Sequence, residues 1–476
     1  QFLTIDQSTI FTSLRLHLKQ LRDLAFKQPA ISRFQWNQGK STLSIDGQPV
    51  SILEFFTSLK DTIKEVKNLI GDIFGDCPSE DILKIINSRT IPTKAGEQRW
   101  YTDKIAEAKP GYSMFEEEKN GFKKFRGQLM TAMACNPRFF QTSLTGTLEC
   151  HRAAILEWFA TLNKIVEGLY YLIICTCGGG VRGTEFSHLL YRNEPGHRRH
   201  LFIVNGSVTI ITEYTKTTSV AGVGKTVART PSPEVGGLCL LVFGVIFHVA
   251  GHIGNHAGIL QASMAERYLS EMFIKDGNQV NSDKLSKVVG SYTANAFGFE
   301  LRQADFRQLM TALQVAFVGT NVLDAEDEEN TSTNIVTLHK LFARTVAVDR
   351  AAYAIDDRTA ETRLSFDLFA EMQRVSFLWH EVIGQLHQEL EKQNIHRDSE
   401  DLPTEEAAKH LKMVIKGNFD RLSQRFDELF KTWAGKLREG VHTDLQGVRA
   451  NVVERLKLRL QERMASSMGK TGDNLK

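Results

Sequence analysis

One short stretch of this sequence combines residues that could bind an anion. Gly178 to Phe186 has the sequence Gly-Gly-Gly-Val-Arg-Gly-Thr-Glu-Phe and ends an uncharged apolar run, Gly168 to Cys177. That run is about three helical turns long, so we expect it to be buried. A fixed guanidinium beside a buried helix end is suited to gripping a phosphate, and Arg182 has this position. Arg182 and Glu185 are three residues apart and share a helical face, so an ordinary structural ion pair is the alternative interpretation.

A second stretch is one residue away from a phosphate-binding P-loop. Ser219 to Thr226 has serine where the first glycine of that motif belongs. A P-loop must open a helix, because the N–H groups of the helix N-terminus bind the phosphate. The residues that follow here, Val227 to Pro233, are strand-like at first and then contain two prolines. We therefore predict no nucleotide at this position and no small-molecule cofactor.

Two patterns contain metal-binding residue types. His248, His252 and His256 recur every four residues, which would align their imidazoles on one face of a helix. The glutamate of an HExxH motif is missing there, and intervening glycines weaken the helix. Cys175 and Cys177 have the wrong spacing for a metal pair and lie in the apolar run. We predict no metal site and assign these histidines to the core or the surface.

Separate pieces of the chain fit a single reaction when they are taken in order. Arg182 opens one helix, Lys216 lies at the tip of a strand hairpin, and Arg307 and Tyr353 lie in later segments. In this order the chain resembles the tyrosine recombinases, and more narrowly the recombinase-like region of fungal telomere-linked RecQ-type helicases and crypton-like mobile elements. The resemblance extends over residues 111–384. The phrases that carry it are Gly111–Phe115 with Asn120, Arg182–Glu185 with Tyr191–Asn193, Lys225 with Arg229 and Pro231, Pro233–Gly236, Asp305–Arg307, Tyr353–Ala354 and Val375–His380.

The resemblance implies a transesterification at a DNA phosphodiester. The guanidinium groups of Arg182 and Arg307 would hold the two non-bridging oxygens, on which charge increases in the transition state. Tyr353 would attack phosphorus and form a covalent phosphotyrosine, which keeps the bond energy for rejoining. A hairpin lysine would protonate the leaving 5′ oxygen, and its pKa must be lowered from about 10.4 by nearby cations and desolvation. Lys216 is the first candidate for this lysine and Lys225 is the second.

The chain departs from the family pattern at two positions. Ala304 stands where the family has histidine, three residues before Arg307, and its side chain neither donates nor accepts a hydrogen bond. Arg344 also replaces a histidine, nine residues before Tyr353, and arginine cannot act as a base near neutral pH. The leading prediction is a tyrosine-type site-specific DNA recombinase or transposase of a mobile element. The alternatives are a catalytically inactive DNA-binding module of a larger, helicase-type protein and a protein-interaction scaffold that does not bind DNA.

The net charge of the 476-residue chain is only +2, with 58 lysines and arginines against 56 aspartates and glutamates. This balance excludes a simple polycation, so DNA must be bound by a local basic surface. Basic residues are concentrated between positions 192 and 229, where we predict the DNA-binding set: Arg192, Arg198, Arg199, Lys225 and Arg229. The resemblance implies double-stranded DNA as the partner, a homo-oligomer on that DNA, and a nuclear location.

The composition is that of an ordinary soluble globular protein, with 42% hydrophobic and 24% charged residues. The six cysteines show no CxxC spacing, and we expect reduced, buried thiols of an intracellular protein. The longest apolar run, Val235 to Leu260, contains glycine and histidine, so we assign it to the core and predict no membrane span. The first residue is Gln1 rather than methionine, as expected of a fragment of a longer protein.

The pattern of apolar residues predicts a mainly α fold with a small antiparallel β-sheet (α+β), and the resemblance implies the tyrosine recombinase catalytic fold. Helical spacing predicts helices over residues 7–27, 50–74, 115–133, 149–177, 184–191, 366–393 and 405–468, and mostly helix from 234 onward. Alternating stretches predict a hairpin around Asp46-Gly47 and a sheet of strands 200–204, 207–214 and 226–229, with Asn205-Gly206 as a type I′ turn. We predict three domains: a helical, core-binding-like DNA-binding domain (1–145), a recombinase-like catalytic domain (146–390) and a C-terminal helical appendage (400–476).

Overall fold

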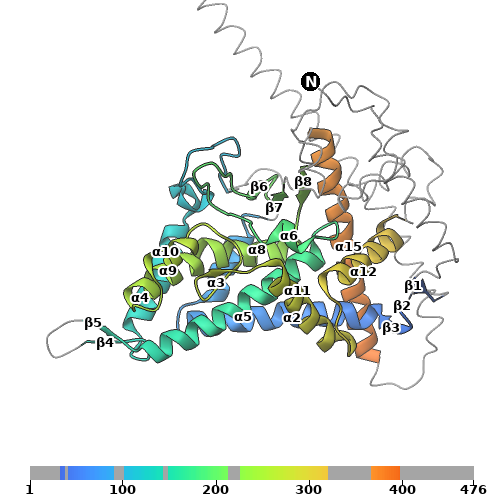
Figure 1. Ribbon diagram of the computed structural model, residues 1–476, viewed down its shortest axis with the longest axis horizontal. Coiled ribbons are helices and arrows are strands. Elements are labelled where there is room, and N and C mark those ends of the chain that lie inside the picture. Colours follow the sequence, from blue (N-terminus) through green and yellow to red (C-terminus); the bar gives the residue numbers. More distant parts are fainter. Residues whose placement is uncertain are drawn as a thin grey trace, which may run out of the picture. The chain divides into compact units, whose positions relative to one another are not determined.

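The computed structural model describes residues 33–37, 41–90, 101–142, 148–212, 226–319 and 366–396. The chain divides into two compact units, Gln1–Ala408 and Lys409–Lys476, and all the described residues belong to the first. They form a mainly helical structure with small antiparallel sheets, which confirms the predicted α+β class (Figure 1). The helices predicted over 7–27 and 405–468, and with them the appendage 400–476, lie outside the described residues.

Two long helices pack along each other at the base of this unit (Figure 1). The first, α2 (Ile52–Phe74), is amphipathic, and the hydroxyl of its N-cap Ser51 accepts a hydrogen bond from Glu54 N. The second, α5 (Arg152–Thr176), is buried on all sides over its last two turns, as its uncharged sequence predicts. These two helices lie on opposite sides of the predicted boundary at 145/146, so apolar packing crosses it; the division into domains stays a prediction.

Two hairpin turns follow from local sequence alone. Strands β1 (Phe34–Trp36), β2 (Thr42–Ile45) and β3 (Gln48–Ser51) form an antiparallel sheet, in which Asp46 and Gly47 both have positive φ, 51° and 84°. Strands β6 (Leu201–Val204), β7 (Ser207–Thr212) and β8 (Val227–Arg229) form the other three-stranded sheet in that order. The β6–β7 turn has φ 53° at Asn205 and 74° at Gly206, which confirms the predicted type I′ turn. Two small hairpins complete the strands: β4 (Phe140–Thr142) with β5 (Leu148–Cys150), and β9 (Ile274–Lys275) with β10 (Asn278–Gln279).

The apolar run after the sheet forms a helix in three parts: α8 (Pro233–Leu241), the π-turn η3 (Val242–Ile246) and α9 (Phe247–His256). Among the described residues it is the one helix long and apolar enough to cross a membrane. In its most apolar window, 94% of the residues are buried inside the protein, which is typical of a core helix.

Two helices begin or end at other residues than the sequence predicts. The helix over 115–133 is replaced at its start by two 3₁₀ turns, η1 (Met114–Glu116) and η2 (Glu118–Asn120), and α4 (Phe122–Cys135) begins only after Gly121, which has φ 79°. The helix over 184–191 is only the single turn α6 (Gly183–Phe186). The other helices are α3 (Ser79–Asn87), α10 (Ala262–Arg267), α11 (Ser282–Phe297), α12 (Gln303–Gln314) with its π-turn η4 (Val315–Gly319), and α15 (Phe366–His396).

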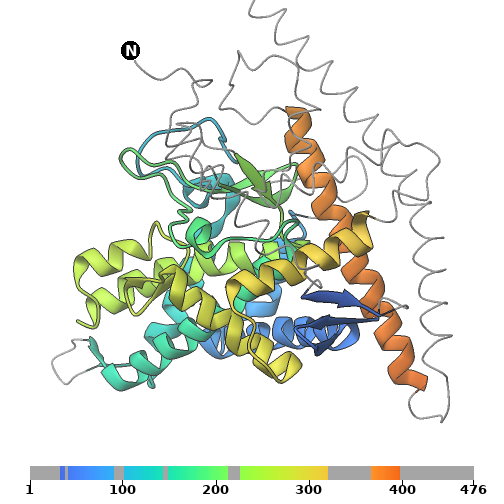
Figure 2. The ribbon, with the colours of Figure 1, turned by 45° about the vertical axis from the view of Figure 1, so that its right-hand side comes forward.

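Helix α15 joins distant parts of the chain. It contacts α2, α5, β8 and η4, and Figure 2 shows it beside the end of α12. Its fully buried Trp379 packs near Phe56 of α2, with ring centroids 5.9 Å apart. The helix predicted over 366–393 is thereby confirmed, and it becomes one wall of the site described next.

Candidate functional site

The site is built on the loop Cys177–Val181, which follows the buried end of α5. Side chains of α12 hold its backbone. Gln314 donates from Nε2 to Cys177 O (3.3 Å) and accepts from Gly179 N at Oε1 (2.9 Å). Arg307 Nε donates to Gly180 O (3.1 Å), and Gln303 Nε2 donates to Val181 O (2.8 Å). Helix α12 therefore fixes the loop at four of its five residues.

Helix α15 holds the same region from another side. Trp379 Nε1 donates to Cys175 O at 2.8 Å, and His380 Nε2 lies 3.1 Å from Thr176 O. These bonds satisfy carbonyl groups at the C-terminus of α5, which have no partner within the helix. The backbone of Gly178 lies so close to Ser376 that a Cβ there would be 2.6 Å from the hydroxyl oxygen. Only glycine fits this approach, which explains one glycine of the sequence motif.

His380 also connects the loop to the sheet, since its Nε2 lies 3.0 Å from Thr230 O. Both neighbours of Nε2 are carbonyl oxygens, so this nitrogen carries the proton. Burial lowers the pKa of His380 to about 4, although its bonds to Thr230 O and Thr176 O oppose the shift. His380 is thus neutral at physiological pH and acts as a hydrogen-bond donor to both carbonyls.

Arg182 belongs to a group of two arginines around one carboxylate. Arg182 Nη1 lies 3.0 Å from Glu185 Oε1, and Arg229 Nη2 lies 2.9 Å from Glu185 Oε2. Arg229 also donates from Nη1 to Thr212 Oγ1 at 2.9 Å. Glu185 and Arg229 are buried, whereas 24% of the Arg182 side chain is exposed. The ion pair expected from the Arg182–Glu185 spacing is confirmed, and Arg182 is the exposed end of this group.

The structure places two of the five predicted catalytic residues and brings them to one loop. Arg307 bonds the carbonyl of Gly180, and Arg182 follows two residues later in the chain. Ala304, which replaces the family histidine, is exposed on α12 one turn before Arg307. The other predicted catalytic residues lie outside the described residues, as does one predicted DNA-binding residue: Lys216, Arg344, Tyr353 and Lys225.

The predicted DNA-binding arginines have unequal positions. Arg198 is exposed and donates to Ile105 O (2.7 Å), and Arg192 is half-buried and donates to Gly111 O (3.1 Å). The side chains of Arg199 and Arg229 are fully buried in ion pairs. Both guanidinium groups are enclosed in this structure, and their assignment to the DNA-binding set stays a prediction.

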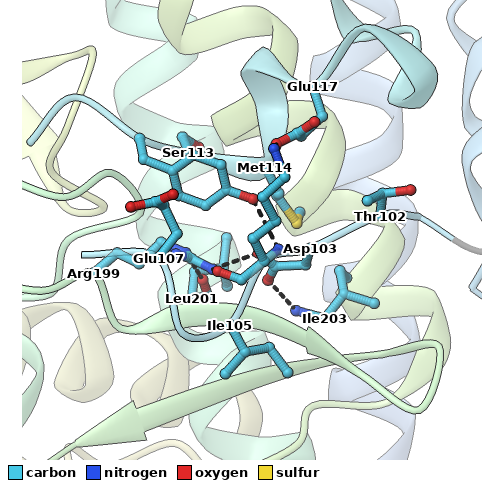
Figure 3. Close-up of polar contacts among 12 residues, drawn as sticks. Thr102, Asp103, Ile105, Glu107, Ser113, Met114, Glu117, Arg199, Leu201 and Ile203 are labelled. Carbon is cyan, nitrogen blue, oxygen red and sulfur yellow. Dashed lines mark hydrogen bonds and ion pairs between the residues drawn. The ribbon is translucent and has the colours of Figure 1, made fainter. Parts of the chain in front are cut away.

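Figure 3 shows the surroundings of Arg199. Its guanidinium group is paired with Asp103, stacks 4.9 Å from the Tyr112 ring centroid and lies 4.5 Å from that of Phe202. Asp103 Oδ2 also accepts a hydrogen bond from Ile203 N at 2.9 Å. Burial raises the pKa of Asp103 and lowers that of Arg199, each against the charge of its partner. These contacts fasten the segment around Asp103 to the sheet.

Sequence reasoning missed the role of two glutamines. Gln303 and Gln314 are buried in the core, where an amide must be hydrogen-bonded on both ends. The sequence spacing does indicate a shared surface, because residues 303, 307 and 314 lie on one face of a helix. No rule of composition, however, indicates that this face meets a glycine loop more than 120 residues earlier in the chain.

The histidine pattern on α9 does not form a metal site in the described part of the chain, where no group of three or more histidine, cysteine, aspartate or glutamate side chains could hold a metal ion. His248 is buried, whereas His252 and His256 are exposed. Burial, followed by the positive charge of Arg126, lowers the pKa of His248 to about 2.

Comparison with protein-family models, with curated proteins and with solved structures found no match to this chain.

Proposed function

We propose that this chain is a DNA-binding protein of the tyrosine recombinase type, which cleaves and rejoins double-stranded DNA through a phosphotyrosine intermediate. One observation carries the proposal: Arg182 and Arg307, from distant parts of the sequence, belong to one loop–helix unit, in which Arg307 bonds the loop two residues before Arg182. Two guanidinium groups so placed suit the two non-bridging oxygens of a phosphodiester. A nuclear location, action on a mobile element and assembly of copies on DNA are part of the same proposal.

The electrostatics of the site support anion binding. Two guanidinium groups, those of Arg182 and Arg229, flank the carboxylate of Glu185, and Arg182 is the one that reaches the surface. The surrounding hydrogen bonds hold the backbone in place before any ligand arrives, so little reorganisation is needed when charge develops. In the proposed reaction Tyr353 loses its phenol proton to solvent and its oxygen attacks phosphorus. The bond to the 5′ oxygen breaks, and Lys216 or Lys225 supplies the proton to that oxygen.

One observation favours a second candidate, a catalytically inactive DNA-binding module of a larger, helicase-type protein. Ala304 occupies an exposed position one turn from Arg307, where the family has a histidine. A methyl group at that position cannot take part in proton transfer. Phosphate binding and proton transfer therefore need separate tests.

Phosphate binding is tested by titrating a fluorescent duplex at several salt concentrations. We expect log K to fall by about 0.9 per phosphate contact for each tenfold rise in salt. An affinity that does not change between low and physiological salt would contradict both candidates.

Cleavage is tested on a duplex selected for binding from a random library and nicked beside the bound site, so that a covalent adduct is trapped. A denaturing gel should show a slow adduct that forms faster at alkaline pH, because the reference pKa of a tyrosine phenol is about 10. Tyr353→Phe should abolish the adduct, and Arg344→His should accelerate its formation near about pH 7. Adduct in Tyr353→Phe would assign the chemistry elsewhere, and no adduct from wild type or Arg344→His would favour the inactive module.

A further inference from the structure

One face of α12 is polar although it lies in the core. Gln303, Arg307 and Gln314 are four and seven residues apart, so they lie within about 40° of one another around the helix axis. All three hydrogen-bond to the loop Cys177–Val181. This face therefore binds backbone groups where a core helix ordinarily packs apolar side chains.

The two glutamines use both ends of their amides. Gln314 is fully buried, with Oε1 accepting from Gly179 N and Nε2 donating to Cys177 O. Gln303 accepts from the Tyr170 hydroxyl (2.8 Å) and donates to Val181 O. Gly179 has φ 92°, in the left-handed region, so Gln314 holds the loop at a residue whose backbone conformation favours glycine.

From this arrangement we infer that Gln303 and Gln314 are positioning residues, which set the place of Arg182 relative to Arg307. The inference rests on the proposed function, since the ligand that both arginines would hold is a phosphate. Arg307 is carried by α12, whereas Arg182 is carried by the loop. The loop can change its path without unfolding α12, so the glutamine bonds determine whether both guanidinium groups engage one phosphate.

In a single variant, Gln314→Glu, the pH determines whether both of these hydrogen bonds form. A neutral carboxyl group reproduces both bonds, because one oxygen accepts from Gly179 N and the hydroxyl donates to Cys177 O. An ionised carboxylate can only accept, so the bond to Cys177 O is lost and a negative oxygen faces that carbonyl. Burial raises the pKa of a carboxyl group above its ordinary value of about 4.3, so the variant should change form between about pH 5.5 and 8.5.

Two described titratable groups beside the loop, Cys177 and His380, do not change charge in this range. Burial raises the pKa of the Cys177 thiol to about 12, and burial lowers the pKa of His380 to about 4. Arg307 remains charged and begins its side chain roughly 10 Å along the helix from position 314. A pH-dependent difference between Gln314→Glu and wild type therefore reports on the new carboxyl group.

The experiment compares Gln314→Glu with wild type at the same pH, by duplex affinity, by its salt dependence, and by hydrogen exchange of peptides covering 177–186. At about pH 5.5 we expect wild-type values. At about pH 8.5 we expect about tenfold weaker binding, a salt slope smaller by about 0.9, as for one lost phosphate contact, and faster exchange of the loop. The matched control is Gln128→Glu, an exposed glutamine of α4, which should follow wild type at every pH.

Several outcomes would overturn the inference. The first is a DNA affinity and a loop exchange of Gln314→Glu that equal those of wild type at about pH 8.5. The second is a melting temperature that returns to the wild-type value at low pH while the DNA affinity does not, because the Gln314 amide would then contribute only to stability. If Gln314→Glu does not fold, Gln303→Glu applies the same test, with Tyr170 as donor and Val181 O as acceptor. If wild type shows no salt-dependent duplex binding, the proposed function fails, and loop exchange alone then decides whether the glutamines position the loop.

Discussion

Two groups of charged residues in this protein use arginine in different ways. Arg199 and Asp103 form a closed pair, one cation with one anion, and their side chains are 0% and 1% exposed. Around Glu185, two arginines share one carboxylate, and Arg182 is 24% exposed. The first group is enclosed and joins two parts of the chain, whereas the second reaches solvent at Arg182. The exposure of one guanidinium group thus separates the candidate anion site from the structural pair.

The surroundings of the two groups agree with this difference. Aromatic rings of Tyr112 and Phe202 cover the Arg199 guanidinium, which excludes water and a ligand alike. Arg182 instead follows a loop whose backbone is held by side chains of α12 and α15. Rigid support beside a partly exposed guanidinium group suits binding, and complete enclosure suits stability.

The largest expected effect is on stability in acid, because each region contains a half-buried histidine with a lowered pKa. Burial lowers the pKa of both His380 and His200 to about 4. The unfolded chain has the ordinary histidine pKa of about 6.5, so it takes up protons at a higher pH than the folded protein. The free energy of unfolding should therefore fall between about pH 6.5 and 4, by about 3 kcal/mol per histidine and about 6 kcal/mol together. Urea titrations across this range measure it.

Two variants show which region is more sensitive to acid. His380→Gln retains an N–H donor for the two carbonyls, and His200→Asn retains an acceptor for Leu190 N. Each variant should remove about half of the decrease in the free energy of unfolding between about pH 6.5 and 4. A stability that is constant down to about pH 4 in wild type would contradict the burial of both histidines.

The next largest effect is expected from opening the closed pair with Asp103→Ala. This variant leaves the buried Arg199 without its anion, and the loss should be about 3–5 kcal/mol in the free energy of unfolding. Glu157→Ala is the control, because Arg138 and Glu157 form an exposed pair, 60% and 68% exposed, and should contribute less than about 1 kcal/mol. Equal costs for the two variants would remove the distinction between closed and exposed pairs.

A smaller effect on stability, with a larger one on binding, is expected from Arg182→Ala. The buried ion pair of Glu185 with Arg229 remains in this variant, so the fold should persist. Binding to duplex DNA should weaken by about 1.5–3 kcal/mol, the range for hydrogen bonds to charged groups, and Arg307→Ala should have a similar effect. Arg152→Ala, at the opposite end of α5, is the control. Unfolding without a loss of DNA affinity would make Arg182 structural, like Arg199.

The smallest effect is expected from Arg198→Ala, next to the closed pair but exposed. Surface substitutions usually change stability by less than about 0.5 kcal/mol, and this one should do the same. If Arg198 contacts DNA, the salt slope of duplex binding should decrease by about 0.9. An unchanged salt slope of duplex binding would show that Arg198 is not part of the DNA-binding surface. Arg192→Ala, measured in the same way, is the comparison.

Local structure was predictable wherever neighbouring residues determine it. Asp46-Gly47 and Asn205-Gly206 both form the predicted turns, because these residues tolerate positive φ. The apolar end of α5 is buried as predicted. The single turn α6 shows the limit of such reasoning, since a helical pattern continued to residue 191 while the chain left the helix at Phe186.

The sequence by itself determined the α+β class, the hairpin turns and the presence of an arginine beside a glycine loop. Only the tertiary structure decided which arginines remain accessible. Arg199 and Arg229 are paired with carboxylates 96 and 44 residues away, and a guanidinium is buried only where such a partner is present to offset the loss of hydration. Tertiary structure also brought α12 to the loop, because hydrogen bonds between segments 122 to 137 residues apart depend on packing that no local pattern specifies.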